Sequence, residues 1–298
     1  MRSVLALRAG IRVNPAETKW KRPLRHIAQF LMRNVGLTLL MFIHNGSIPD
    51  DEKNNNTMCY FIEINLTKIE LEKRFGARMP EDFQWKPVFF LSGFDFPRLP
   101  VVVSSRSEFL VAHWGLIPLW VREESKALEM RSKTLNARME SICEKPSFKK
   151  PFQNHRCLIP AHGFYEWHHA GARKYPFYIT LANNEPFAFA GIADEWLDPV
   201  TKIKISTFSL ITTQANNLLK KIHNTKKRMP VILSPENESK WIDPSLSVES
   251  AFQFLQPYPP ELLKAWPVSR QVASRTSDPY SPELIQPVSY PELQIDLS

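Results

Sequence analysis

The first regular alternation of apolar and polar residues lies at 61–66 and has the two-residue period of a β-strand. Directly after it, Thr67 and Glu70 form a capping box, which is the signature of a helix start. Gly76 lies where that helix should end. The pattern therefore predicts a strand that is followed at once by a short helix.

Further apolar runs, bounded by turn residues, predict seven more strands. They are 101–103, 109–114, 156–159, 164–167, 177–181, 187–192 and 203–211. Asn183 and Asn184 lie between two of these strands and predict a hairpin turn.

Three more helices are expected, at 213–223, from the Ser234-Pro235 pair onward, and at 248–255. Strands outnumber helices and are joined by hairpins, so the predicted fold is α+β, an antiparallel barrel-like β-sheet core with flanking helices. Nine of the 25 prolines lie in the last 55 residues, which predicts extended segments with little regular structure after Leu263. No G-x-G-x-x-G or P-loop motif occurs, which argues against a nucleotide-binding α/β sheet.

Residues 1–57 differ from the rest of the chain. They are basic, lack a clear hydrophobic period and end in a polar run at 50–57. They do not have the features of a secretory signal, and their longest apolar run, at 37–43, is too short to span a membrane. We expect this extension to be absent from the mature protein, either because translation starts at Met58 or because it is removed. The rest is then a single domain over 58–293 with a tail at 294–298.

The charge of the chain permits a polyanionic partner without requiring one. Residues 1–57 carry nine Lys/Arg against four Asp/Glu, which is +5 of the formal net charge of +8 and leaves +3 for the other 241 residues. That weak excess fits nucleic acid and equally fits a solvated mixed surface. The three cysteines form no C-x-x-C pair, which favours a reducing compartment. The histidines show no firm metal-ligand spacing, so neither a metal nor a cofactor is expected.

Cys59 directly follows Met58, and removal of the methionine would make it the first residue. An N-terminal cysteine carries an amine with a pKa of about 7.7–8.0 and a thiol with a pKa of about 8.5 on adjacent carbons. The amine can form an imine with an aldehyde, and the thiol can then close a five-membered thiazolidine. An internal cysteine is more often a small buried apolar residue.

Four other residues allow a chemical or a purely structural interpretation. Glu166 lies between two aromatic residues, where burial would raise its pKa for acid–base work, unless strand alternation points it to solvent. His223 near a helix end could donate a proton, or could simply be favoured there by the helix dipole. Asn136 and Arg138, at an expected helix start, could hold a ligand or cap the helix.

Several ordered segments together resemble the SRAP family, the SOS-response-associated peptidases also described as abasic-site processing proteins. They are Trp114-Gly115-Leu116-Ile117-Pro118, Asn136-Ala137-Arg138-Met139-Glu140, Pro160-Ala161-His162-Gly163-Phe164-Tyr165-Glu166-Trp167, Ala190-Gly191-Ile192, Ile211-Thr212-Thr213-Gln214-Ala215-Asn216, His223, Arg228-Met229-Pro230-Val231-Ile232-Leu233 and Trp266-Pro267-Val268-Ser269. The likeness extends from about residue 58 to 293, and each segment alone would be weak evidence.

The resemblance implies a catalytic role for four residues. Cys59 matches the N-terminal nucleophile that crosslinks to the ring-opened sugar of an abasic site. Asn136 matches the residue that holds the cysteine and the adduct. Glu166 matches the general acid/base, which is also implicated in release of the N-terminal cysteine and in reversal of the adduct. His223 matches the histidine that helps to open the sugar ring.

The resemblance also implies the partners. Arg138 and Arg228 match arginines that contact DNA, and the expected partner is single-stranded DNA with abasic sites, bound by a monomer without a membrane or a cofactor. The expected location is the cytoplasm, on the nucleoid when DNA is bound. Two departures stand out, because Phe61 takes the place of a frequent family arginine and the spacing from His223 to Arg228 is longer than usual. The alternatives are a cysteine-dependent peptidase acting on other proteins and a non-covalent single-stranded DNA-binding module.

Overall fold

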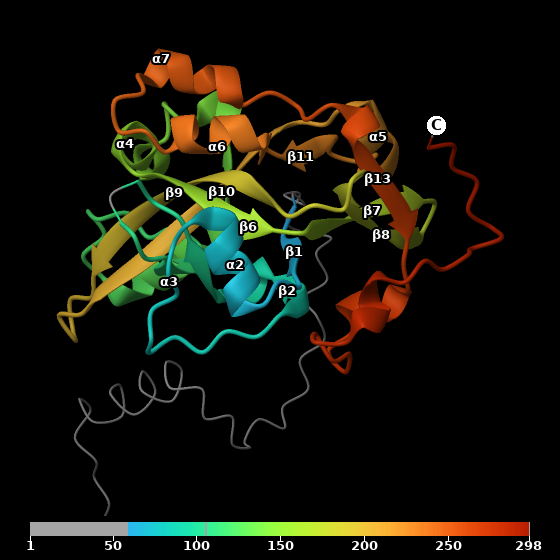
Figure 1. The fold of residues 1–298 in the computed structure, drawn as a ribbon, viewed down its shortest axis with the longest axis horizontal. Coiled ribbons are helices and arrows are strands. Elements are labelled where there is room, and N and C mark those ends of the chain that lie inside the picture. Colours follow the sequence, from blue (N-terminus) through green and yellow to red (C-terminus); the bar gives the residue numbers. More distant parts are fainter. Residues whose placement is uncertain (1–58, 105, 298) are drawn as a thin grey trace, which may run out of the picture. The chain divides into compact units, whose positions relative to one another are not determined.

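Two β-sheets enclose the main hydrophobic core of the computed structural model, which describes residues 59–104 and 106–297 (Figure 1). Ile62 and Phe164 of one sheet belong to the same buried cluster as Phe189 and Leu210 of the other. The rings of Phe164 and Phe189 meet edge to face, with their centroids 5.8 Å apart. The α+β class that the sequence predicted is therefore confirmed.

The first sheet has five strands, which are all antiparallel. In spatial order they are β13 (Leu263–Pro267), β8 (Arg173–Leu181), β7 (Gly163–Ala170), β1 (Phe61–Ile64) and β2 (Val88–Ser92). The short strand β1 lies between β7 and β2, with Phe61 opposite Tyr165 and Ser92. Strand β1 is therefore paired on both sides, and this pairing fixes the short segment that leads into it.

The second sheet has eight strands and is mixed. Its main path is β12 (Ile232–Leu233), β9 (Phe187–Leu197), β10 (Lys204–Gln214), β4 (Leu110–Trp114) and β3 (Arg98–Val101), while β6 (Arg156–Ala161) pairs with β9, and β5 (Asn136–Arg138) and β11 (Arg228–Pro230) pair with β10. Strand β10 runs parallel to β4 and β5, which departs from the expected antiparallel pattern. Within the described residues the two sheets stay separate, so the core is barrel-like without closing into a barrel.

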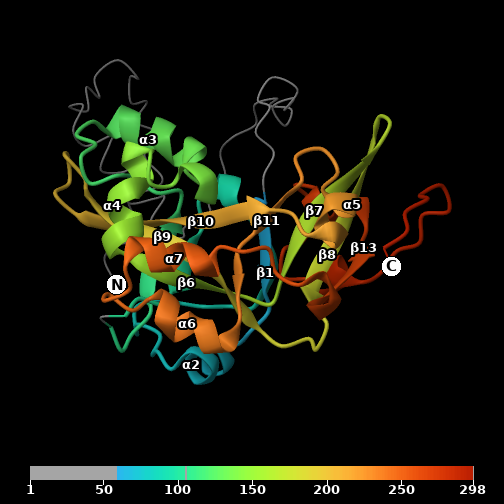
Figure 2. The same cartoon turned by 90° about the horizontal axis from the view of Figure 1, so that it is seen from above.

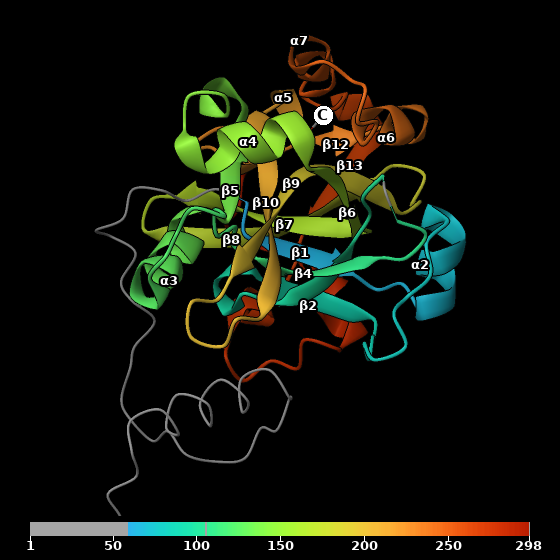
Figure 3. The ribbon, with the colours of Figure 1, turned by 90° about the vertical axis from the view of Figure 1, so that its left-hand side faces the viewer.

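Short helices cover the sheets. They are α2 (Lys68–Phe75), α3 (Glu124–Lys133), α4 (Pro146–Asn154), α5 (Asn217–Ile222), α6 (Pro235–Trp241) and α7 (Val248–Ala251). Single 3₁₀ turns are η2 (Gly93–Asp95), η3 (Met139–Ser141), η4 (Phe252–Phe254), η5 (Pro260–Leu262), η6 (Arg270–Ala273) and η7 (Pro282–Ile285). Helices α4 and α6 pack on β6 and β9, and α5 packs on β7 (Figure 2). Helices α3 and α2 lie on opposite sides of the strands (Figure 3).

The predicted start and end of α2 are confirmed in detail. The Glu70 amide donates to the Thr67 hydroxyl oxygen at 3.3 Å, and the Thr67 amide donates to the Glu70 carboxylate at 2.7 Å. Gly76 ends the helix with a φ of 64°, a left-handed conformation that glycine adopts without strain. No helix of the described residues has the length and apolar character to cross a membrane.

Two expectations from the sequence are wrong, and a third is right only in part. Asn183 and Asn184 do form a turn, but it is no hairpin because β8 and β9 belong to different sheets. Asn136 and Arg138 lie in strand β5 and not at a helix start. The expectation of little regular structure after Leu263 holds beyond Pro267, where only η6 and η7 follow among the described residues, but not for β13, which pairs with β8 over five residues. The proline that ends β13 is tolerated because this strand is at the sheet edge.

Candidate active site

Cys59 lies where the two sheets adjoin, two residues before β1, and only 1% of it is exposed. Its main-chain carbonyl accepts a hydrogen bond from Asn136 Nδ2 at 2.9 Å. Asn136 is itself fixed in β5, opposite Leu210 of β10. The bond therefore joins the segment that leads into β1 of one sheet to a strand of the other sheet.

Glu166 of β7 is buried beside Cys59, with 4% of it exposed, so the solvent-facing orientation that the sequence left open does not occur. Burial raises the pKa of Glu166 to about 8, and a hydrogen bond with the Cys59 thiol lowers it only in part. The pKa of the thiol is also raised, first by burial and then by the neighbouring carboxyl group. At neutral pH the pair consists of a carboxylic acid and a thiol, both uncharged.

His223 follows α5 as its C-terminal cap, and 3% of it is exposed. Its Nδ1 lies 3.1 Å from the main-chain carbonyl of Arg228 and 3.4 Å from Glu166 Oε2. A carbonyl oxygen can only accept, so Nδ1 carries the hydrogen and Nε2 keeps its lone pair in the neutral ring. Burial lowers the pKa of His223. The contact with Glu166 is then one between two neutral groups, and not an ion pair at neutral pH.

The two arginines with an implied DNA contact differ in exposure. The side chain of Arg138 is 51% exposed, and its Nε lies 3.7 Å from Glu140 Oε2. The side chain of Arg228 is only 6% exposed, and its guanidinium pairs with both carboxylate oxygens of Glu140 and donates to the Thr212 carbonyl at 2.7 Å. The prediction that each arginine binds DNA stays a prediction, and Arg138 is the more accessible of the two.

The structure thus brings together Cys59, Asn136, Glu166 and His223, while Arg138 and Arg228 meet through Glu140 at the adjoining edge. Sequence reasoning gave Glu140 no role. The available signal was its place in the Asn-Ala-Arg-x-Glu segment, together with the rule that a buried arginine needs a counter-charge.

Phe61, which replaces the frequent family arginine, belongs to an aromatic cluster beside the site. Its ring centroid lies 4.7 Å from that of Trp167 and 5.2 Å from that of Phe90. Whatever an arginine would contact from this position, Phe61 instead offers apolar ring surface.

The described histidines give no metal site. No group of three or more His, Cys, Asp or Glu side chains in the described ranges is arranged to hold a metal ion. His162 instead lies with Nδ1 3.2 Å from the buried Glu63 carboxylate and Nε2 3.0 Å from the Asn184 carbonyl.

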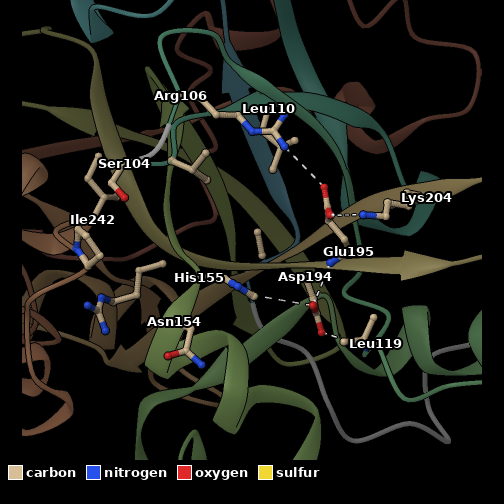
Figure 4. Close-up of a pocket in the computed structure, with 14 residues that line it drawn as sticks. Ser104, Arg106, Leu110, Leu119, Asn154, His155, Asp194, Glu195, Lys204 and Ile242 are labelled. Carbon is tan, nitrogen blue, oxygen red and sulfur yellow. Dashed lines mark hydrogen bonds and ion pairs between the residues drawn. The ribbon is translucent and has the colours of Figure 1, made fainter.

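A cavity of about 430 Å³ lies away from these residues, where β10 begins (Figure 4). Its charged groups are already paired: Glu195 contacts Arg106 at 3.6 Å and Lys204 at 3.7 Å, and Asp194 accepts from the Leu119 amide at 3.0 Å. Cys59 and its partners do not line it. The candidate residues from the sequence therefore lie outside this cavity.

The fold and the Cys59 cluster define a known class of protein. The family model described as SOS response associated peptidase (SRAP) matches residues 58–275, and the chain belongs to this family.

Several relatives are named for abasic sites. YoqW of Bacillus subtilis, an abasic site processing protein, is 42% identical over 175 residues, which cover 58% of this chain and 74% of YoqW. HMCES of Gallus gallus, also called an abasic site processing protein, is 30% identical over 206 residues, which cover 62% of this chain and 59% of HMCES. A solved structure of a protein from Bacteroides thetaiotaomicron is 38% identical, with a TM-score of 0.74, over 78% of this chain and all of that one.

Proposed function

We propose that this protein processes abasic sites by forming a covalent thiazolidine with them in single-stranded DNA, through Cys59 as the N-terminal residue. The observation that supports this most is the convergence of the cysteine with one buried acid and one buried neutral imidazole. The test is to incubate the protein with an oligonucleotide that carries one abasic site, and to look for an adduct that survives denaturing electrophoresis.

The reaction follows from the ordinary chemistry of an aminothiol with an aldehyde. The Cys59 amine adds to the aldehyde carbon, and loss of the resulting hydroxyl as water leaves an imine. The thiol then adds across the C=N bond, so that its sulfur bonds carbon and its hydrogen ends on nitrogen. Asn136, which binds the Cys59 carbonyl, fixes the main chain of the nucleophile during these steps.

Glu166 and His223 supply complementary proton transfers. Glu166 is protonated at neutral pH and can give its proton to the departing hydroxyl, regain the proton that the nitrogen releases as the imine forms, and then relay the thiol hydrogen to the nitrogen. Opening of the sugar needs a proton to leave the C1 hydroxyl and another to reach the ring oxygen. His223 is neutral, so we assign it the first of these transfers, through Nε2.

The same pKa values argue against the alternative of a peptidase that acts on other proteins. A cysteine peptidase attacks with a thiolate, whose pKa is lowered by a neighbouring cation. Here burial raises the pKa of the Cys59 thiol, and its hydrogen-bond partner is a carboxyl group.

We expect the mature chain to begin at Cys59, because an amide nitrogen at that position cannot form the imine. Intact-mass measurement of protein purified from its native cells should give the mass of residues 59–298. A mass corresponding to all 298 residues would contradict the proposed covalent chemistry and leave non-covalent DNA binding as the remaining activity.

We expect Arg138→Gln to weaken non-covalent binding of single-stranded DNA in a salt-dependent way. Its exposed guanidinium can contact a phosphate, and loss of one such contact should reduce the slope of log affinity against log salt by about 0.7. Arg106→Gln is the matched control, since Arg106 is 48% exposed, lies 3.6 Å from a glutamate and lines the separate cavity. Equal slopes for the two variants, measured by fluorescence anisotropy between low and high salt, would remove Arg138 from the interface.

A further inference from the structure

Glu140 lies in η3, directly after β5, and takes no part in the chemistry proposed above. Its carboxylate pairs with Arg228 through both oxygens and also faces Arg138. Burial alone would raise the pKa of Glu140, but the hydrogen bonds and charge of Arg228 outweigh it, and the pKa is lowered. Glu140 is therefore an anion at neutral pH.

Arg228 depends on this anion. Its guanidinium is almost fully buried, and a buried cation without a counter-charge is strongly unfavourable. Its other hydrogen bonds go from Nη2 to the carbonyl and the hydroxyl of Thr212, which carry no charge to balance it. Glu140 supplies the balancing charge, and its two-pronged contact also fixes the orientation of the planar guanidinium.

The main chain of Arg228 in turn fixes His223. Arg228 pairs with Gln214 in the sheet, and its carbonyl accepts the Nδ1 hydrogen of His223. The Lys227 amide closes the same loop by donating to the His223 carbonyl at 2.9 Å. A chain of direct contacts therefore runs from Glu140 through Arg228 to the imidazole that faces Glu166.

We propose that Glu140 is a positioning residue for His223: by anchoring Arg228 it holds the imidazole with Nδ1 hydrogen-bonded, so that the hydrogen stays on Nδ1 and the lone pair on Nε2. Glu140 also offsets the positive charge that Arg228 exerts on the ring. The other groups whose charge or proximity acts on His223 are Glu166 and His169 of β7 and Lys226 of the adjoining loop. The catalytic consequence rests on the proposed function, whereas the effect on the imidazole itself does not.

The test is Glu140→Gln, followed by NMR titration of the His223 ring in the full chain without DNA. Without the Glu140 anion, the positive charge of Arg228 is no longer offset and repels the protonated His223 ring more strongly. The His223 pKa should therefore fall below that of the wild type. On abasic DNA the crosslinking rate should fall by about tenfold or more, and by no more than the 10²–10⁴-fold that complete loss of an acid–base group costs. The low-pH limb of the rate profile should move to lower pH by the same shift.

Glu144→Gln is the matched control, because it makes the same chemical change on an exposed residue four positions later and should alter neither measurement. Glu140→Asp keeps the charge but is too short for two-pronged pairing, so it should show a smaller change in the same direction and serves if the Gln variant does not fold. A His223 titration and rate profile that match the wild type in the folded variants would overturn the proposal. If wild-type protein forms no adduct, the proposed function fails, and the titration still decides the role of Glu140.

Discussion

Replacing Cys59 with alanine should abolish the denaturation-resistant adduct with abasic DNA while leaving non-covalent binding nearly unchanged. The thiol is needed to close the thiazolidine, whereas binding is expected from phosphate contacts such as that of Arg138. Alanine also fits the site, because Cys59 is packed in the core as a small side chain. The measurement is denaturing electrophoresis for the adduct, alongside anisotropy for binding of the same oligonucleotide.

The control is Cys143→Ala, which removes a half-buried cysteine outside the cluster and should crosslink like the wild type. Addition of a hydride reductant distinguishes the role of the residue-59 amine from that of the thiol. An N-terminal alanine retains the amine, so a reducible imine should be trapped in the Cys59→Ala protein only when reductant is present. A stable adduct without reductant would show that Cys59 is not the nucleophile.

Glu166→Gln should slow crosslinking by about 10²–10⁴-fold without eliminating it, since an aminothiol and an aldehyde also react unaided. The effect should depend on pH. The acid form of Glu166 is present below its pKa of about 8 and is lost above it, so the wild-type advantage over the variant should shrink as pH rises through 8. Single-turnover rates between pH 6 and 9 measure this. Equal rates at neutral pH would remove Glu166 from the chemistry.

The same substitution should raise the stability of the fold. The pKa of Glu166 is higher in the folded protein than in the unfolded chain, so the folded state holds the proton more tightly and wild-type stability falls as pH rises from the unfolded pKa to about 8. Glutamine carries no such cost, so Glu166→Gln should exceed the wild type in free energy of unfolding at pH 8, and less so at pH 5. Loss of rate with a gain in stability is typical of a catalytic residue, whereas a structural carboxyl group would lose both. Urea denaturation at the two pH values gives the comparison.

Much of the fold could be predicted where the residues of a segment themselves indicate its secondary structure or its burial. The cap residues of α2 and the long apolar runs of β9 and β10 are examples. The assignment of strands to sheets could not be predicted. The turn sequence at Asn183 and Asn184 is compatible both with strands that pair with each other and with strands that enter different sheets. Helix α3 gave no clear period since it buries only Ala127, and three-residue strands such as β5 owe their form to the neighbouring strand and not to propensity.

The candidate site could be predicted as a set of residues only through the family resemblance. No local pattern relates Cys59 to Asn136, which are 77 positions apart, or Glu140 to Arg228, which are 88 apart. The protonation of the site was equally hidden, since the neutral states of Glu166 and His223 result from burial by distant segments. The alternatives that the sequence left open for Glu166 were therefore decided by packing.

In the function proposed above, each protein molecule reacts once, so Cys59 must stay unmodified until its target binds. Peroxides attack thiolates that are accessible to solvent. With 1% of Cys59 exposed and the pKa of its thiol raised, small oxidants meet neither an accessible nor an ionised sulfur. In that function, this burial slows oxidation of the nucleophile and reserves the cysteine for a substrate that is bound next to it.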